Sequence, residues 1–332
     1  MNKIVEEDIK SIIQKADFIS KLNNKNILLI GGTGFFAKWF IILIDYLNNV
    51  FSFNISLTIT IRSYKKFVSE FINVIDINKY QYIESDIENL KLDNKDFDFV
   101  LYFASPDPYV IDEEKLYNTI AQGTENIVNI FENANIERLI FTSSGAVYGC
   151  NYHNSKETDI CKPNTIYAKA KKYAEELILQ SNINISIARC FVFNGPFNEK
   201  HNYFAMANFI DSVINNRDII INGDGSPIRS YLYMADAIYW LLTILLKSKN
   251  KSIYNVGGRN GISIYDLAKK VSKQVNNYTG KVDILTKSNY NYPTPKYIPN
   301  NKKIIKELGV KENYTLDEAI KRTIEWNLII DK

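Results

Sequence analysis

Residues 26–40 read NILLIGGTGFFAKWF, an apolar run that passes through a glycine-rich turn into a segment with helical character. Gly31, Gly34 and Ala37 place a small residue at every third position, directly after the predicted strand. Glycine permits a tight turn there and lets backbone N–H groups approach a pyrophosphate at the positive end of the following helix. Glycine-rich turns are common, so it is the context of strand, turn and helix that favours a dinucleotide site over an ordinary tight turn.

Strands and helices continue to alternate through the first 190 residues. Helix-like segments at 36–47, 113–133 and 166–180 separate short runs rich in Ile, Leu, Val and Phe. Strands that are covered on both faces have this composition, and the alternation predicts a parallel, doubly wound sheet, an α/β fold of the Rossmann type. The predicted strands are 26–31, 55–61, 80–83, 97–103, 138–143 and 185–190.

The regular alternation of strands and helices ends after Cys190. There the turn Asn-Gly-Pro at 194–196 leads into a helical pattern, a strand at 219–222 and a second turn, GDGSP. We therefore expect residues 1–190 to form an N-terminal helix plus the dinucleotide-binding domain. Residues 191–332 are expected to form mainly a smaller α/β substrate lobe, interleaved with the first domain. The first 18 residues lack the apolar core of a secretory signal and are typical of an amphipathic helix.

Composition excludes several classes of protein. The 332 residues are 46% hydrophobic and 23% charged, which is typical of a globular chain of roughly two domains. A net charge of +3 gives no support to a nucleic-acid or membrane partner, and no apolar run approaches the ~20 residues of a membrane span. Cys150, Cys161 and Cys190 have neither disulfide nor metal spacing, which indicates reduced thiols in a cytoplasmic protein. With only His153 and His201, no metal site is expected.

The end of the second strand bears on the choice of cofactor. An acidic residue normally binds the adenosine ribose there, whereas this chain has Ile61 and Arg62. An arginine can pair with a 2′-phosphate, so NADP competes with NAD, but a solvated arginine at a strand end would explain Arg62 equally well. The residues leave NAD or NADP open.

Tyr167 and Lys171 form one of four YxxxK patterns, so the pattern alone carries no weight. Only Tyr167 both opens a helical segment and follows a strand that ends in hydroxyls, with Ser144 in the run FTSSGAVYG. Lys171, at i+4, lies on the same helix face as the phenol. The other pairs are Tyr152/Lys156 in a polar loop, Tyr265/Lys269 in the second lobe and Tyr292/Lys296 among prolines.

These residue types suit proton transfer from a sugar hydroxyl. The pKa of a phenol must fall by about 3 units, roughly 4 kcal/mol, for the phenol to act near neutrality. One cation about 5 Å away supplies roughly 3 kcal/mol at an effective dielectric near 20, so Lys171 and an oxidised nicotinamide together would suffice. We expect Tyr167 to take the proton, Lys171 to acidify it and fix the cofactor ribose, and Ser144 to hold the reacting hydroxyl. The alternative is a surface tyrosine and lysine on an exposed helix.

These motifs resemble those of the extended short-chain dehydrogenase/reductase family, specifically its NAD(P)-dependent nucleotide-sugar epimerases, dehydratases and decarboxylases. The resemblance covers nearly the whole chain after Lys25: GGTGFFA, Ser85–Ile87, Phe103–Ser105, Gly123–Thr124, SSGAVYG, YAKAK, NGP, GDGSPIRSYLYMAD and YNVGG. It implies a nucleoside-diphosphate sugar as substrate, with Arg229 on the diphosphate and Ser144 on the sugar. It also implies a homodimer built from the helices at 113–133 and 166–180. Together with Arg62, the expected cofactor contacts are Gly31, Gly34, Phe35, Phe36, Asp86, Ile87, Ala104, Ser105, Tyr167 and Lys171.

Departures from the family pattern narrow the expected reaction. Members that eliminate water across C5 and C6 usually carry Asp-Glu after the active-site hydroxyl, and decarboxylases a Glu, whereas this chain has Gly145 and Ala146. Without an acid there, C4 oxidation and reduction, as in an epimerase, is favoured. An NADPH-dependent keto-sugar reductase, a 4,6-dehydratase or decarboxylase, and a non-catalytic dinucleotide-binding protein are the alternatives. Val192 and Ile120 replace two asparagines common in the family, which predicts an atypical sugar pocket.

Overall fold

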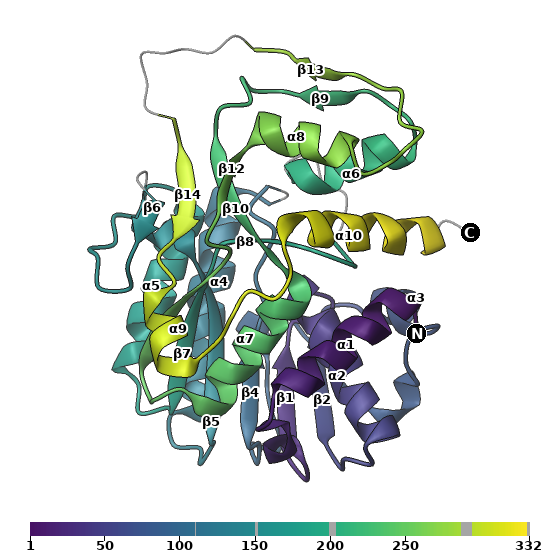
Figure 1. The fold of residues 1–332 in the computed structure, drawn as a ribbon. Coiled ribbons are helices and arrows are strands. Elements are labelled where there is room, and N and C mark those ends of the chain that lie inside the picture. The colour runs from purple at the N-terminus through teal and green to yellow at the C-terminus, as the bar shows by residue number, and fades with distance from the viewer. Residues whose placement is uncertain (110, 150–151, 199–203, 287–293, 331–332) are drawn as a thin grey trace.

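Seven parallel strands form the central sheet of the computed structural model, in the order β11-β7-β5-β4-β1-β2-β3 (Figure 1). The structure describes residues 1–109, 111–149, 152–198, 204–286 and 294–330. The strand order reverses between β1 and β4, and ligands of doubly wound sheets bind at such a point, outside the carboxyl ends of the strands. The predicted α/β, Rossmann-type sheet is confirmed. Its strands are β1 (Asn26–Ile30), β2 (Ser56–Ile61), β3 (Gln81–Glu84), β4 (Phe99–Tyr102), β5 (Arg138–Ser144), β7 (Ile185–Cys190) and β11 (Ser252–Val256).

Helices cover both faces of this sheet because successive strand residues point to opposite sides. Ile27 and Leu29 of β1 belong to one core with α2 (Phe35–Val50), α3 (Tyr64–Phe71) and α7 (Met234–Lys247). Leu28 and Ile30 belong to the other core, with α4 (Glu113–Phe131) and α5 (Ile166–Gln180). The alternation explains why residues 27–30 of β1 are apolar at every position.

The later part of the chain builds a second layer and also returns to the first sheet, since β11 is an edge strand of that sheet and α7 belongs to the core on one of its faces. In Figure 1 the remaining elements gather mostly at one end of the molecule, above the central sheet. β8 pairs with β10, so the strand that follows Cys190 joins the two layers. These elements are β6 (Tyr152–Ser155), β8 (Val192–Asn194), α6 (Ala205–Ile214), β9 (Ile219–Ile221), β10 (Ile228–Tyr233), β12 (Gly261–Ser263), α8 (Ile264–Ser272), β13 (Val282–Ile284), β14 (Lys296–Pro299), α9 (Lys302–Leu308) and α10 (Leu316–Ile330).

The predicted N-terminal helix is present as α1 (Lys3–Lys15), which packs on α7 and α10. Its fully buried Asp8 accepts a hydrogen bond from the Tyr233 hydroxyl at 2.6 Å and pairs with Arg322 at 2.8 Å. Burial raises the pKa of Asp8 to about 6, while Tyr233 and Arg322 lower it. The first helix is thus tied by a buried charge to the last one.

Most predicted boundaries shift by one or two residues. The strand predicted to end at residue 143 continues to Ser144, and the one predicted to include Gly31 stops at Ile30. Cys161 and Cys190 are free thiols. Within the described residues, no helix combines the length and apolar composition that crossing a bilayer requires. Cys150, His201 and Tyr292 lie outside the described residues.

Candidate functional site

The glycine turn after β1 has the geometry that a bound pyrophosphate needs. Gly31 has a φ of 96°, and a Cβ there would lie 2.7 Å from the Cα of Ala104, so the turn and the start of the β4 loop approach too closely for any side chain. Gly34 is the residue before α2 and donates its N–H to the Gly31 carbonyl at 3.0 Å. The N–H groups of the first turn of α2 have no partners within the helix, so this turn fits an anionic phosphate.

Phe35 and Phe36 begin α2, and both are partly buried. The Phe36 ring lies 6.0 Å from that of Phe103 and 5.1 Å, edge-on, from that of Phe193 in β8. The start of α2 is therefore joined through aromatic contacts to both walls of the crevice, the loop after β4 and the strand β8.

Arg62, Asp86 and Ile87 lie at the same edge of the sheet, just beyond the ends of β2 and β3. Arg62 and Asp86 are exposed, whereas Ile87 packs on α4 at Gly123, where a Cβ would lie 2.5 Å from the Ile87 side chain. Asn126 of α4 donates to the Ile87 carbonyl at 2.9 Å. The loop expected to meet the adenine is thus held in place by α4.

The structure brings Ser144, Tyr167 and Lys171 together. Thr165 caps α5 by accepting the Ala168 N–H at 3.2 Å, which places Tyr167 in the first turn of the helix. The hydroxyls of Ser144 and Ser105 lie near the Tyr167 phenol. Lys171 is 1% exposed, and its Nζ lies 5.9 Å from the centre of the Tyr167 ring. The alternative of an exposed surface pair is therefore wrong.

The electrostatics of the pair differ from the sequence-based expectation. Burial raises the pKa of Tyr167 to about 12, although the hydroxyls of Ser105 and Ser144 lower it. Burial also lowers the pKa of Lys171 to about 8, and the Lys171 ammonium donates to the Thr142 carbonyl at 3.0 Å. The loss of hydration on burial outweighs the attraction between the Lys171 ammonium and a Tyr167 phenolate that the spacing suggested. The protein's own groups therefore keep the Tyr167 phenol protonated. An acidic phenol would require further positive charge in the crevice.

Tyr297 of β14 is a neighbour of this set that sequence reasoning missed. Its hydroxyl lies 3.5 Å from the Ser144 hydroxyl and donates to the Cys190 carbonyl at 3.4 Å. Its ring lies 4.6 Å from that of Phe191 and 5.8 Å from the Arg229 guanidinium carbon. Arg229 and Tyr297 are paired positions of β10 and β14, so this pairing links the expected diphosphate residue to Ser144. No spacing pattern in the chain connects residue 297 to residue 144.

Arg229 itself is half-buried at the edge of this group. Its Nη1 donates to the carbonyls of Ile228 at 3.0 Å and Pro295 at 3.4 Å. Both contacts are to neutral backbone oxygens, and no ion pair of Arg229 appears among the described residues.

The Phe191 ring occupies the space beside Gly145. A Cβ at Gly145 would lie 2.7 Å from Cζ of that ring and 2.8 Å from each of two further ring atoms. The ring contacts Tyr297 on one side, and Tyr148 lies 6.4 Å away, centre to centre. A side chain at position 145 would therefore require this buried aromatic cluster to move.

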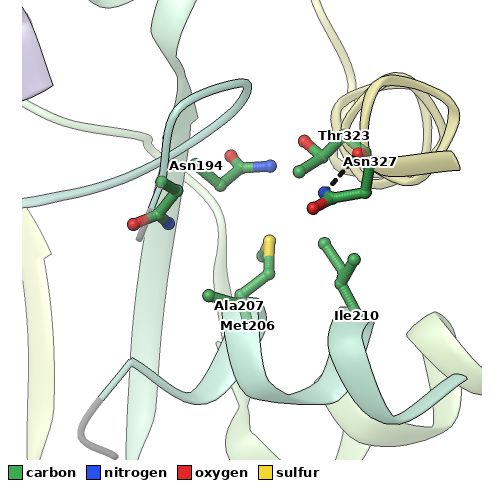
Figure 2. A pocket seen from close by; sticks show the side chains of 7 residues that line it. Asn194, Met206, Ala207, Ile210, Thr323 and Asn327 are labelled. Carbon is green, nitrogen blue, oxygen red and sulfur yellow. Dashed lines mark hydrogen bonds between the residues drawn. The ribbon is translucent and has the colours of Figure 1, made fainter. Parts of the chain in front are cut away.

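A cavity of about 10 Å³ lies nearby, between the end of β8, α6 and α10. In Figure 2, Asn194 forms one wall and Thr323 and Asn327 the opposite wall, above Met206 and Ile210 of α6. Asn194 is 1% exposed, and neither the oxygen nor the nitrogen of its side-chain amide has a hydrogen-bond partner among the described residues. A cavity of this size has room for about one water molecule.

The fold and the site together define a dinucleotide-binding α/β enzyme with a candidate Ser-Tyr-Lys set. A model of the NAD dependent epimerase/dehydratase family matches residues 27–257, and the chain belongs to that family. This confirms the resemblance to the extended short-chain dehydrogenases/reductases and, with it, the prediction of an enzyme. Of NAD and NADP, which the sequence left open, NAD is the cofactor of the family.

The relatives include both a 4,6-dehydratase and a 4-epimerase. The chain is 27% identical over 328 residues to the dTDP-D-glucose 4,6-dehydratase of Bos taurus, covering 91% of this chain and 88% of the relative. It is 26% identical over 264 residues to the N-acetyl-alpha-D-glucosaminyl-diphospho-ditrans,octacis-undecaprenol 4-epimerase of Escherichia coli O157:H7, covering 76% and 73%. A solved UDP-N-acetylglucosamine 4-epimerase from Methanobrevibacter ruminantium M1 has a TM-score of 0.79 at 21% identity, covering 93% of this chain and 99% of that one. This structural likeness bears on the fold alone.

Proposed function

We propose that the protein is an NAD-dependent epimerase that inverts C4 of a sugar carried on a nucleoside diphosphate. The observation that best supports this reaction is the pairing of an assembled Ser144, Tyr167 and Lys171 with the absence of any acid at Gly145 and Ala146. The set is sufficient for removal and return of a hydroxyl proton. The neighbouring positions offer nothing for elimination of water.

Dehydration across C5 and C6 needs further groups that deliver and remove protons beside the hydroxyl residue. A carboxylate at position 145 would collide with the Phe191 ring, since even its Cβ would lie 2.7 Å from a ring carbon. Overall similarity to a dehydratase therefore counts for less than this local difference, because function depends on the site more than on the fold.

Bound NAD supplies a hydride acceptor, and the residues of the crevice fit it. Gly31, Gly34 and the first turn of α2 would hold the pyrophosphate, beside Phe35 and Phe36. Asp86 and Ile87 would meet the adenine, Ala104 and Ser105 would line the groove, and Lys171 would fix the ribose. Arg62, which is exposed, would lie at the rim near the adenosine ribose.

The remaining residues act on the sugar. In its ionised form, the Tyr167 phenolate would accept the proton of the C4 hydroxyl, and the resulting phenol would later return it; the hydroxyls of Ser105 and Ser144 lower the pKa of this group. Ser144 orients that hydroxyl, and Arg229 pairs with the diphosphate, because a guanidinium fork matches phosphate oxygens. Tyr297 lies between these two contacts and would line the sugar pocket.

We also infer a homodimer through α4 and α5. The two helices pack side by side, and Tyr173 donates to Glu125 across them at 2.6 Å. Ile178 is 1% exposed and belongs to the protein's own core, so the partly exposed residues Ile166, Tyr173 and Leu177 are left for an interface. Sedimentation of the purified protein tests this inference.

The activity is tested with purified protein and UDP-, dTDP-, CDP- and GDP-sugars in deuterated water, after the copurifying cofactor has been identified by mass spectrometry. An epimerase gives a product of unchanged mass without net change in nicotinamide absorbance. Loss of one water with uptake of solvent deuterium would identify a dehydratase, and stoichiometric consumption of NADPH a reductase. Tyr167→Phe should abolish turnover; unchanged turnover would refute the assigned role.

A further inference from the structure

Tyr167, Lys171 and Glu175 follow one another at four-residue intervals along one face of α5. Glu175 is completely buried, and its carboxylate accepts a hydrogen bond from the Ser143 hydroxyl at 2.6 Å. Ser143 directly precedes Ser144 at the end of β5. One turn earlier, Lys171 bonds to the carbonyl of Thr142 in the same strand. Two successive turns of α5 are thus fixed to two consecutive residues of β5, Thr142 and Ser143.

Arg189 of β7 completes this arrangement. It is 3% exposed and donates a hydrogen bond to each carboxylate oxygen of Glu175, from Nε at 2.9 Å and from Nη2 at 2.7 Å. Its Nη1 donates to the Glu157 carbonyl at 3.4 Å. Ser143 and Arg189 are paired positions of the neighbouring strands β5 and β7, so one carboxylate holds two strands and a helix together.

Stability alone does not account for such a pair. Taking two charges out of water costs several kcal/mol. Replacing a buried ion pair with apolar residues of similar volume often leaves the protein equally stable or more stable. Glu175 is also one of the groups that favour the charged form of Lys171, against the burial that disfavours it. The pair therefore acts on both the position and the charge of the residues proposed to transfer the proton.

We propose that Glu175 and Arg189 are positioning residues that hold Lys171 and the end of β5 in the arrangement required by Ser144 and Tyr167. This inference rests on the proposed function of those residues. The titratable groups that face the Lys171 ammonium are Tyr167 and Glu175 from α5 and Cys190 from β7. From β5 it meets only the Thr142 carbonyl and the Phe141 ring, the latter at 4.9 Å.

The titration of Lys171 can be read directly, without substrate, by NMR of protein labelled with ¹³C at lysine Cε. The signal is assigned as the one missing from Lys171→Arg, and its wild-type midpoint is expected at about 8. In Glu175→Gln the midpoint should fall by about one to two pH units, as for a carboxylate lost about 6 Å away at an effective dielectric near 20. In Glu175→Met/Arg189→Met, which removes both charges, the midpoint should return toward the wild-type value.

Turnover, unlike the titration, should be affected in both variants. With the bonds to Ser143 and Arg189 altered, kcat should fall about tenfold or more in both variants while KM changes by about twofold or less. Asp8→Asn is the matched control, because it breaks another buried carboxylate–arginine pair, far along the chain from Ser144. It should lower thermal stability and leave both kcat and the Lys171 titration unchanged.

The inference is overturned if Glu175→Gln behaves like Asp8→Asn, with lower stability but the wild-type titration and kcat. Should Glu175→Gln fail to fold, Ser143→Ala removes one bond to Glu175 without stranding a charge, and an unchanged kcat there would count against the inference in the same way. Wild-type turnover in Tyr167→Phe would instead refute the proposed function. The NMR titration would still report on the pair itself.

Discussion

Gly145→Ala tests whether position 145 can accept any side chain, on which the proposed reaction depends. The backbone of Gly145 is not in the left-handed region, so alanine by itself should stabilise the fold by about 0.4–1 kcal/mol through the unfolded chain. Against this, the new Cβ would lie 2.7–2.8 Å from three atoms of the Phe191 ring. Overpacking of a filled site costs about 1–3 kcal/mol, so the net expectation is a loss of about 1–2 kcal/mol.

The assay is the free energy of unfolding in urea, measured as a double-mutant cycle with Phe191→Leu. Because leucine lacks the ring atoms that Cβ meets, Gly145→Ala should become neutral or stabilising in that background. Gly223→Ala is the control, since a Cβ there meets no atom within 4 Å. If Gly145→Ala stabilises the wild-type protein as Gly223→Ala does, the site has room for a side chain, and the structural case against a carboxylate there fails.

Gly31→Ala places a Cβ 2.7 Å from the Ala104 backbone at a φ of 96°, so it should destabilise the protein by about 2–4 kcal/mol and abolish NAD binding, as measured by thermal unfolding and by calorimetric titration with NAD. Tyr297→Phe removes the hydroxyl between Ser144 and the Cys190 carbonyl. In this variant kcat should fall about tenfold, and the free energy of unfolding should fall by about 1 kcal/mol. Unchanged steady-state kinetics in the variant would show that the hydroxyl has no part in the reaction. Activity should decline above pH 8 as Lys171, whose pKa is lowered to about 8, loses its proton, and a pH–rate profile flat to pH 10 would contradict this. The pH dependence of stability has the opposite sign to that of activity. Between pH 8 and 10.5 Lys171 is protonated in the unfolded chain and deprotonated in the folded one, so its contribution to the free energy of unfolding rises with pH. Lys171→Met should flatten that rise.

The central sheet could be predicted from the chain because its strands are apolar on both faces and each is followed by a helical pattern. Tyr167 and Lys171 could be paired because an interval of four residues has a fixed meaning on a helix. The short helix α3 was missed because its eight residues are fewer than the window over which a helical period is recognised, although Tyr64, Phe67, Val68 and Phe71 have helical spacing.

Other features depend on contacts between distant segments. Tyr297 meets Ser144 across 153 residues, through a strand pairing that no local pattern encodes. The contact between Gly145 and Phe191 likewise arises only when β5 and β7 lie side by side. The burial that raises the pKa of Tyr167 in the protein alone could not be predicted either, because spacing reveals a neighbouring charge but not the depth of burial.

The anchorage of α1 has a consequence for biosynthesis. Among the described residues, the side-chain partners of Asp8 are Tyr233, Tyr314 and Arg322, which follow it in the chain by 225 residues or more. Domains generally fold from the N-terminus as the chain emerges, but this helix cannot settle until those partners have been made. Its apolar stripe therefore stays exposed to solvent until α7 and α10 have been synthesised.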